Sequence, residues 1–192
     1  RQSLVGSEMC IRDRSEVDHV IMGHALQTSS QAIFGARRAG ILSGIPHHVP
    51  MLTINRLCGS GAQSVVSAAQ MIMLGEAETV VAGGMENLSQ SPHVLRDERT
   101  TYKLGRSPRK GEEIPRDMED YFFTNLRDDV CGYFMAQTSD ELCKMLDVSR
   151  EDADSFAALS HQRAENSIRN GIWEDEIVEV ITPDGVFGSA HD

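Results

Sequence analysis

The sequence predicts an α/β fold in which parallel strands and crossover helices form a layered α-β-α core. Apolar runs of strand length alternate with stretches of helical periodicity, and residues 21–95 contain only six charged side chains, so this block should be largely buried. The net charge of −11 and the pI near 5.0 argue against nucleic acid or an anionic membrane surface as a partner. The charge-free run 57–75 is interrupted by Ser and Gln, which favours a buried helix over a membrane span.

Five elements are expected in this apolar block, and they alternate between strand and helix. A strand–helix–strand order predicts parallel strands joined by crossover helices. The second helix is apolar or small nearly all round, which predicts burial on most of its sides. The expected elements are strands at 17–22, 49–57 and 78–82 and helices at 31–42 and 61–74.

The rest of the chain is less regular and more charged. Residues 96–129 contain seventeen charged side chains in thirty-four positions, which indicates an exposed region after a boundary near 91–92. Within it we expect an extended excursion at 96–116, helices at 134–146 and 150–170, and a returning strand at 177–181. The helix at 150–170 should begin at Ser149, which starts a variant capping box.

Cys58 is the residue on which chemistry could centre. It lies in Asn-Arg-Leu-Cys-Gly-Ser-Gly at 55–61, where a predicted strand ends, two glycines permit a tight turn and a helix begins. Unpaired N–H groups and the positive end of the helix dipole favour a thiolate there. The glycines leave room for a substrate carbonyl beside backbone N–H groups that could form an oxyanion hole. The alternative is a small buried apolar cysteine.

The four cysteines otherwise predict no metal site and no disulfide framework. Cys10, Cys58, Cys131 and Cys143 form no Cys-x-x-Cys pair and have no histidine at zinc-finger spacing. A chain of this size does not need disulfides, so reduced thiols in a cytosol-like compartment are expected.

The segment from Asn55 to Glu86 resembles the active-site region of the thiolases. It begins with Asn-x-x-Cys-Gly-Ser-Gly and ends with Val-Val-Ala-Gly-Gly-Met-Glu, and similar residues extend over roughly 17–182. The resemblance implies a thiolase-like layered α-β-α core, here an incomplete N-terminal half, with an extended loop subdomain. It places the nucleophile at Cys58, whose own N–H would help to hold the thioester oxygen.

The resemblance also implies an acyl-CoA acyltransferase of fatty acid metabolism. Cys58 would carry an acyl thioester in a Claisen condensation of acyl-CoA or in thiolysis of 3-ketoacyl-CoA. Coenzyme A thioesters would be substrates, with no bound cofactor. Met135 stands where the family has a Met-Gly segment that lines the acyl pocket, although a core methionine of an amphipathic helix is the alternative. A homodimer or homotetramer in the cytoplasm is expected.

Several family motifs are absent from the sequence: the Asn-Glu-Ala segment, the Gly-His-Pro histidine and the second cysteine in Cys-x-Gly-Gly-Gly. We therefore expect a fragment without the second catalytic half. Its expected parts are an unmatched, non-native-looking segment at 1–14, the core with the nucleophile at 15–91, a loop and helical subdomain at 92–176, and a returning strand with a truncated end at 177–192. The alternatives are a ketosynthase-type condensing enzyme and a catalytically inert acyl-binding fragment.

Overall fold

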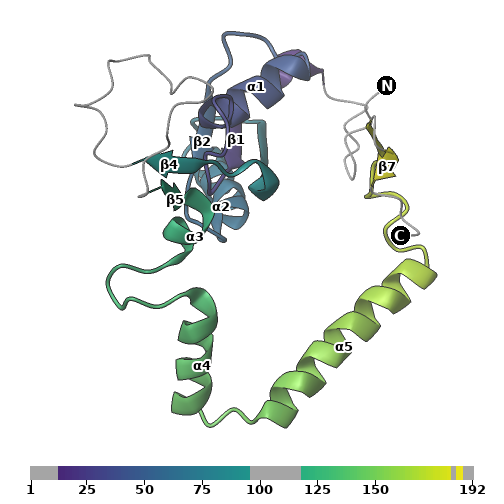
Figure 1. Ribbon diagram of the computed structural model, residues 1–192. Coiled ribbons are helices and arrows are strands. Elements are labelled where there is room, and N and C mark those ends of the chain that lie inside the picture. The colour runs from purple at the N-terminus through teal and green to yellow at the C-terminus, as the bar shows by residue number, and fades with distance from the viewer. Residues whose placement is uncertain (1–12, 96–117, 183–184, 188–192) are drawn as a thin grey trace. The chain divides into compact units, whose positions relative to one another are not determined.

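The computed structural model describes residues 13–95, 118–182 and 185–187 and divides into two compact units (Figure 1). One unit is Arg14–Met135, and the other combines Arg1–Asp13 with Ala136–Asp192. The excursion predicted at 96–116 lies outside the described residues, as does most of the segment predicted at 1–14.

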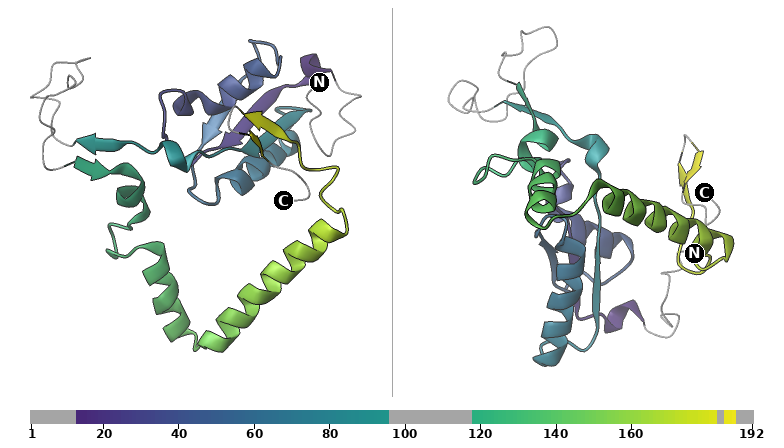
Figure 2. Two further views of the ribbon diagram at one scale, coloured as in Figure 1. Left: turned by 45° about the vertical axis from the view of Figure 1, so that its right-hand side comes forward. Right: turned by 90° about the horizontal axis from the view of Figure 1, so that it is seen from below.

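The first unit is built on a three-stranded parallel sheet with the order β2-β1-β3. The central strand β1 (His19–Gly23) pairs with β2 (Met51–Ile54) and with β3 (Val80–Gly84). Parallel neighbours need crossover connections, and α1 (Gly35–Leu42) and α2 (Ser60–Met73) supply them. The two helices lie on opposite faces of the sheet (Figure 2). The predicted α/β fold with parallel strands and crossover helices is confirmed.

The core of this unit surrounds β1. Val20 and Ile21 are both 0% exposed. Because successive residues of a strand point to opposite faces, both faces of β1 are covered. Val20 belongs to a buried cluster with Ala36, Ile45 and Val49, which joins the α1 side of the sheet to the segment that leads into β2.

The helix α2 approaches the end of β1 very closely at Gly23. A Cβ atom at this position would lie 2.4 Å from the carbonyl carbon of Ser60 and 2.6 Å from the backbone nitrogen of Gly61. These distances are far below van der Waals contact, so only glycine fits. The first turn of α2 is therefore held against the C-terminal end of the central strand.

Asp18 fastens the entrance of β3 to that of β1. Its Oδ2 accepts hydrogen bonds from the backbone N–H groups of Glu78 (2.8 Å) and Thr79 (2.9 Å), and its own N–H donates to the Thr79 carbonyl (2.9 Å). The N–H of Thr79, followed by that of Glu78, holds the pKa of Asp18 below its usual value of 3.8, because both bonds favour the ionised carboxylate.

The remaining elements of the described structure are 3₁₀ helices at Arg14–Glu16, Ala32–Phe34 and Leu88–Gln90, β4 (His93–Leu95), β5 (Met118–Asp120), α3 (Tyr121–Leu126), α4 (Met135–Met145), α5 (Arg150–Arg169), β6 (Val180–Thr182) and β7 (Gly185–Phe187). In the first unit, β4 and β5 pair antiparallel, and Asp120 caps α3 by accepting from the N–H of Phe122 (2.9 Å). In the second unit, β6 and β7 pair antiparallel. No helix among the described residues is long and apolar enough to cross a membrane.

The predicted elements are present, with shifted ends. The strand predicted at 49–57 already ends at Ile54, because the next residues turn into the loop that carries Cys58. The helices predicted at 134–146 and 150–170 are α4 and α5, and Ser149 caps α5 by accepting from the N–H of Asp152 (3.0 Å). The last predicted strand begins at Val180 rather than at 177. The elements β4, β5, α3 and β7 were not predicted.

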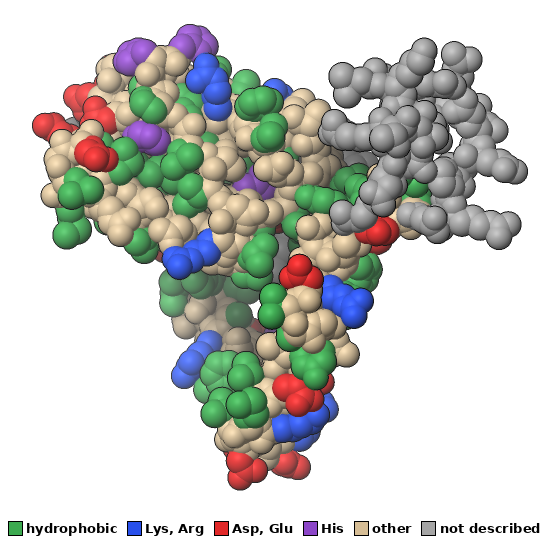
Figure 3. Space-filling model, turned by 90° about the vertical axis from the view of Figure 1, so that its left-hand side faces the viewer, with side chains coloured by type: hydrophobic (Ala, Val, Ile, Leu, Met, Phe, Trp, Pro, Cys, Tyr) green, Lys and Arg blue, Asp and Glu red, His purple; other side chains and the backbone are tan. Residues whose placement is uncertain are grey.

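The prediction that α2 is buried on most sides is wrong. Its buried residues are Ser60, Ser64 and Ala68 alone, whereas Val65 is 57% and Ile72 47% exposed. The physical reason is the size of the sheet, since three short strands cover only one side of the helix. Figure 3 shows one face of the molecule, on which exposed hydrophobic side chains lie among polar and charged ones.

The close approach at Gly23 predicts contrasting effects of two glycine substitutions. Gly23→Ala should lower the free energy of unfolding by about 3 kcal/mol, because backbone atoms of α2 must move to admit a methyl group. Gly61→Ala should be neutral or stabilising by up to about 1 kcal/mol, because its Cβ meets nothing within 4 Å and alanine is a better helix former. Urea unfolding followed by circular dichroism measures both, and equal midpoints would contradict the close approach.

The hydrogen bonds of Asp18 predict a pH-dependent contribution to stability. Because the pKa is lower in the folded state, the advantage of the wild type over Asp18→Asn should be present above about pH 4 and lost as the pH falls through the folded-state value. Urea midpoints measured from pH 7 downward test this, with Glu76→Gln as the control for the loss of an exposed carboxylate. An advantage over Asp18→Asn that stays constant down to pH 3 would rule out the ionised carboxylate as its source.

Candidate active site

Cys58 lies in the loop between β2 and α2, at the C-terminal edge of the sheet. The strand ends at Ile54, earlier than predicted. The helix begins at Ser60, two residues after the cysteine and thus as near to it as the sequence predicted. Helices α1 and α2 leave this edge toward opposite faces, so the chain diverges here. In open parallel sheets, such a switch point at the carboxyl ends of the strands is where ligands bind.

Hydrogen bonds fix the unusual conformation of this loop. Leu57 has a φ of 49°, a left-handed conformation that is strained for a residue with a branched side chain. Its N–H donates to Asn55 Oδ1 (2.8 Å), and its carbonyl accepts from Ser60 Oγ (2.6 Å) and from the Ser60 N–H (3.0 Å). Ser60 Oγ also accepts from the Arg56 N–H (2.8 Å). The residue next to Cys58 is thus held from both sides.

The backbone around Cys58 leaves one hydrogen-bond donor beside the thiol. The N–H groups of Gly59 and Ser60 are used by the carbonyls of Arg56 (3.1 Å) and Leu57 (3.0 Å). In the part of the chain that the structure describes, the Cys58 N–H has no hydrogen-bond partner, and the Cys58 side chain is exposed. A thiol and an adjacent free N–H are what an acyl carbonyl requires, with the first to attack its carbon and the second to bind its oxygen.

Cys58 borders a pocket of about 920 Å³, and Met135 lines the same pocket. The structure therefore brings the two predicted site residues to one cavity, whose size is typical of small-molecule sites. Most of its larger side chains are apolar, while charged groups of the segment 127–129 lie along one part of the wall. The apolar side chains that line it are Leu26, Leu57, Met85, Leu88, Phe122, Leu126 and Met135.

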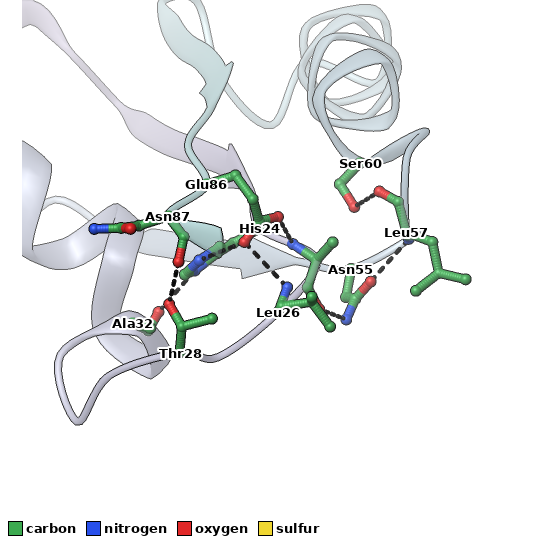
Figure 4. Close-up of polar contacts among 10 residues, drawn as sticks. His24, Leu26, Thr28, Ala32, Asn55, Leu57, Ser60, Glu86 and Asn87 are labelled. Atoms are coloured by element: carbon green, nitrogen blue, oxygen red, sulfur yellow. Dashed lines mark hydrogen bonds and ion pairs between the residues drawn. The ribbon is translucent and has the colours of Figure 1, made fainter. Parts of the chain in front are cut away.

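Polar side chains follow the C-terminal ends of all three strands (Figure 4). Two of them, His24 and Glu86, line the pocket. His24 follows β1, Asn55 follows β2 and Glu86 follows β3. Glu86 Oε2 accepts from the Ala25 N–H (2.8 Å), and its Oε1 accepts from the Leu26 N–H (3.2 Å) and lies 3.1 Å from His24 Nε2. Asn55 Nδ2 donates to the Ala25 carbonyl (2.8 Å). The three loops are therefore joined by hydrogen bonds.

Sequence analysis did not assign this polar cluster. One signal was present, because Glu86 is one of only six charged residues in 21–95 and lies four residues after the end of the strand predicted at 78–82. Its partners are about 60 residues away in the chain, so spacing alone could not connect them. Phe122 and Leu126 were also missed, because they belong to α3, which was not predicted.

The described residues contain no group of three or more His, Cys, Asp or Glu arranged to hold a metal ion. Cys58, Cys131 and Cys143 are free thiols in the structure, while Cys10 lies outside the described residues. The groups at the pocket that could take part in chemistry include the Cys58 thiol, backbone N–H groups, the His24–Glu86 pair and the charged side chains of residues 127–129.

Comparison with known proteins identifies relatives over most of the chain. The human mitochondrial 3-ketoacyl-CoA thiolase is 42% identical over 171 residues, which are 88% of this chain and 41% of the relative. A probable acetyl-CoA acyltransferase of Staphylococcus aureus is 38% identical over 169 residues, again 88% of this chain and 41% of the relative. The chain thus spans about two-fifths of the length of these relatives.

Solved structures agree with this relationship. The human mitochondrial 3-ketoacyl-CoA thiolase in complex with CoA matches with a TM-score of 0.76 and 40% identity, covering 88% of this chain and 41% of the other. The acetyl-CoA acetyltransferase of Bacillus anthracis matches with a TM-score of 0.75 and 33% identity, covering 92% and 43%. The family model described as the thiolase N-terminal domain matches residues 8–187. The resemblance found in the sequence is confirmed: the chain belongs to the thiolase family and corresponds to its N-terminal domain.

Proposed function

We propose that this chain is the acyl-accepting part of an acyl-CoA acyltransferase, with Cys58 as the nucleophile. The observation that carries the proposal is the placement of an exposed thiol in a fixed loop, beside a free N–H, on a largely apolar pocket. Membership of the thiolase family supports this chemistry. The CoA complex of the human relative supports a coenzyme A thioester as the substrate rather than a separate cofactor.

In the first half-reaction, Cys58 Sγ attacks the thioester carbonyl of acyl-CoA. A new sulfur–carbon bond forms, the bond to the CoA sulfur breaks, and CoA leaves as its thiol with the proton that Cys58 gives up. The Cys58 N–H donates to the carbonyl oxygen while negative charge develops there. Because the Leu57 turn fixes the orientation of this N–H, the donor needs no rearrangement during the reaction.

The second half-reaction removes the acyl group from Cys58. Attack by the enolate of a second acyl-CoA gives a Claisen condensation, and attack by CoA completes thiolysis of a 3-ketoacyl-CoA. Both directions belong to fatty acid metabolism and use the same acyl-enzyme. The thiolase family match favours this assignment over the ketosynthase-type alternative. The non-enzymatic alternative is an inert acyl-binding fragment. The experiment on Cys58 described below distinguishes it from an acyl-accepting chain.

We further propose that Met135 contacts the acyl chain. It lines the pocket together with Phe122 and Leu126, and a methionine adapts its shape to flexible ligands. From the family alone we also propose a homodimer or homotetramer. A cytoplasmic location is our prediction, although the human relative is mitochondrial by name.

The nucleophile is tested by intact-mass spectrometry after incubation with acetyl-CoA. The wild type should gain one acetyl group, Cys58→Ser should gain none, and Cys131→Ser should behave as the wild type, since Cys131 is exposed but does not line the pocket. If the wild type gains no acetyl group, and iodoacetamide labels Cys58 no faster than Cys131, the chain is inert and the proposal fails for it.

The role of Met135 is tested by narrowing the pocket. Met135→Trp should slow acylation of Cys58 by octanoyl-CoA on the order of tenfold more than acylation by acetyl-CoA, because a long chain needs the apolar volume. Met145→Trp is the matched control, since Met145 ends the same helix, is 79% exposed and does not line the pocket. Equal effects of Met135→Trp on both substrates would remove Met135 from the acyl site.

A further inference from the structure

Glu86 is connected to the cysteine loop through an unbroken series of hydrogen bonds. It binds the N–H of Ala25, the Ala25 carbonyl binds Asn55 Nδ2, and Asn55 Oδ1 binds the N–H of Leu57, each at 2.8 Å. The series crosses the sheet edge from the β3 loop to the β1 loop and on to the β2 loop, in the spatial order of the strands. Figure 4 shows this line of contacts, with Leu57 at its far end.

His24 holds the near end of the series in place. The ring is buried, with Nδ1 3.1 Å from the Ala32 carbonyl and Nε2 3.1 Å from Glu86 Oε1. A carbonyl oxygen can only accept, so Nδ1 carries a proton and donates it to this bond. The Glu86 side chain is thereby fixed to the 3₁₀ helix that precedes α1.

We propose that Glu86 and Asn55 are positioning residues for Cys58, acting through the left-handed turn at Leu57. Glu86 sets the Ala25 peptide group, this group sets the Asn55 amide, and Asn55 holds the strained φ of 49° that orients the Cys58 N–H and thiol. The inference rests on the proposed function of Cys58. It adds that a carboxylate whose hydrogen bonds, among the described residues, go to the β1 loop controls the geometry of the nucleophile.

The inference is tested by two readouts on the same variants. Hydrogen exchange of the Leu57 amide reports the turn itself, and the rate of acetyl transfer from acetyl-CoA to Cys58 reports its chemical consequence. Asn55→Leu and Glu86→Gln should each accelerate Leu57 amide exchange at least about tenfold and slow acetyl transfer about tenfold, because a freed turn leaves its strained conformation. Asn87→Leu is the matched control, since the Asn87 carbonyl, not its side chain, accepts from Thr28 Oγ1 (2.8 Å).

A double-mutant cycle separates positioning from general damage. If Glu86 acts through Asn55, Glu86→Gln should have no further effect on acetyl transfer or Leu57 exchange in the Asn55→Leu background. Effects that multiply in the double variant, or Leu57 exchange in Glu86→Gln equal to that of the wild type, would overturn the inference. If circular dichroism shows that Glu86→Gln does not fold, Glu86→Asp takes its place. It keeps the charge but is too short to hold both N–H groups.

The two readouts also separate this inference from the proposed function. A folded wild type that accepts no acetyl group, whatever its Leu57 exchange, would disprove the acyltransferase proposal for this chain. Leu57 exchange would then still decide the positioning inference, since faster exchange in Glu86→Gln supports it and unchanged exchange refutes it.

Discussion

The contact between Gly23 and the first turn of α2 is the constraint on which the site depends. Because no atom larger than hydrogen fits at Gly23, the backbone of α2 starts directly against the end of the central strand. Gly84 extends this contact on β3, where a Cβ atom would lie 3.2 Å from the Gly23 carbonyl oxygen and 3.5 Å from Gly61 Cα. Two strand ends and a helix start therefore form one rigid corner, and Cys58 precedes that helix by two residues. The position of the Cys58 thiol is therefore set by backbone packing.

Buried polar side chains near this corner are paired, because a buried polar group left unpaired would cost about 1–3 kcal/mol. Ser64 is 0% exposed, and its hydroxyl lies 2.7 Å from the carbonyls of both Gly61 and Gly83, so it links α2 to β3. His24 and Glu86 meet the same requirement at the ends of β1 and β3. The polar cluster is thus part of the structure as well as of the site. A substitution in this cluster changes packing and loop geometry together. The non-additivity of two substitutions in a double variant is therefore more informative than the size of the effect of either substitution alone.

Sequence reasoning was most informative where the signal is local. Cys58 could be predicted as a site residue because the glycine-flanked turn and the start of α2 lie within a few residues of it, whereas the prediction for Met135 rested on family resemblance alone. The helix α3 has six residues, too few for a helical period to be recognised, and β4 pairs with a strand 23 residues or more along the chain. The apolar character of α2 is evident from the sequence. The sequence does not show that only the side with Ser60, Ser64 and Ala68 is covered, because this depends on the width of the sheet.

The contacts of His24 restrict the role that this residue can have in the proposed reaction. Among the residues that line the pocket, His24 is the histidine, yet both its ring nitrogens are engaged, with the Ala32 carbonyl and with Glu86. A ring nitrogen engaged in this way becomes available to the thiol only if its present contact breaks. In the proposed reaction, His24 is therefore expected to hold Glu86 rather than to act as the base for Cys58. In the proposed first half-reaction the thiol proton leaves with CoA, so transfer of the acyl group to Cys58 does not depend on His24 as a base.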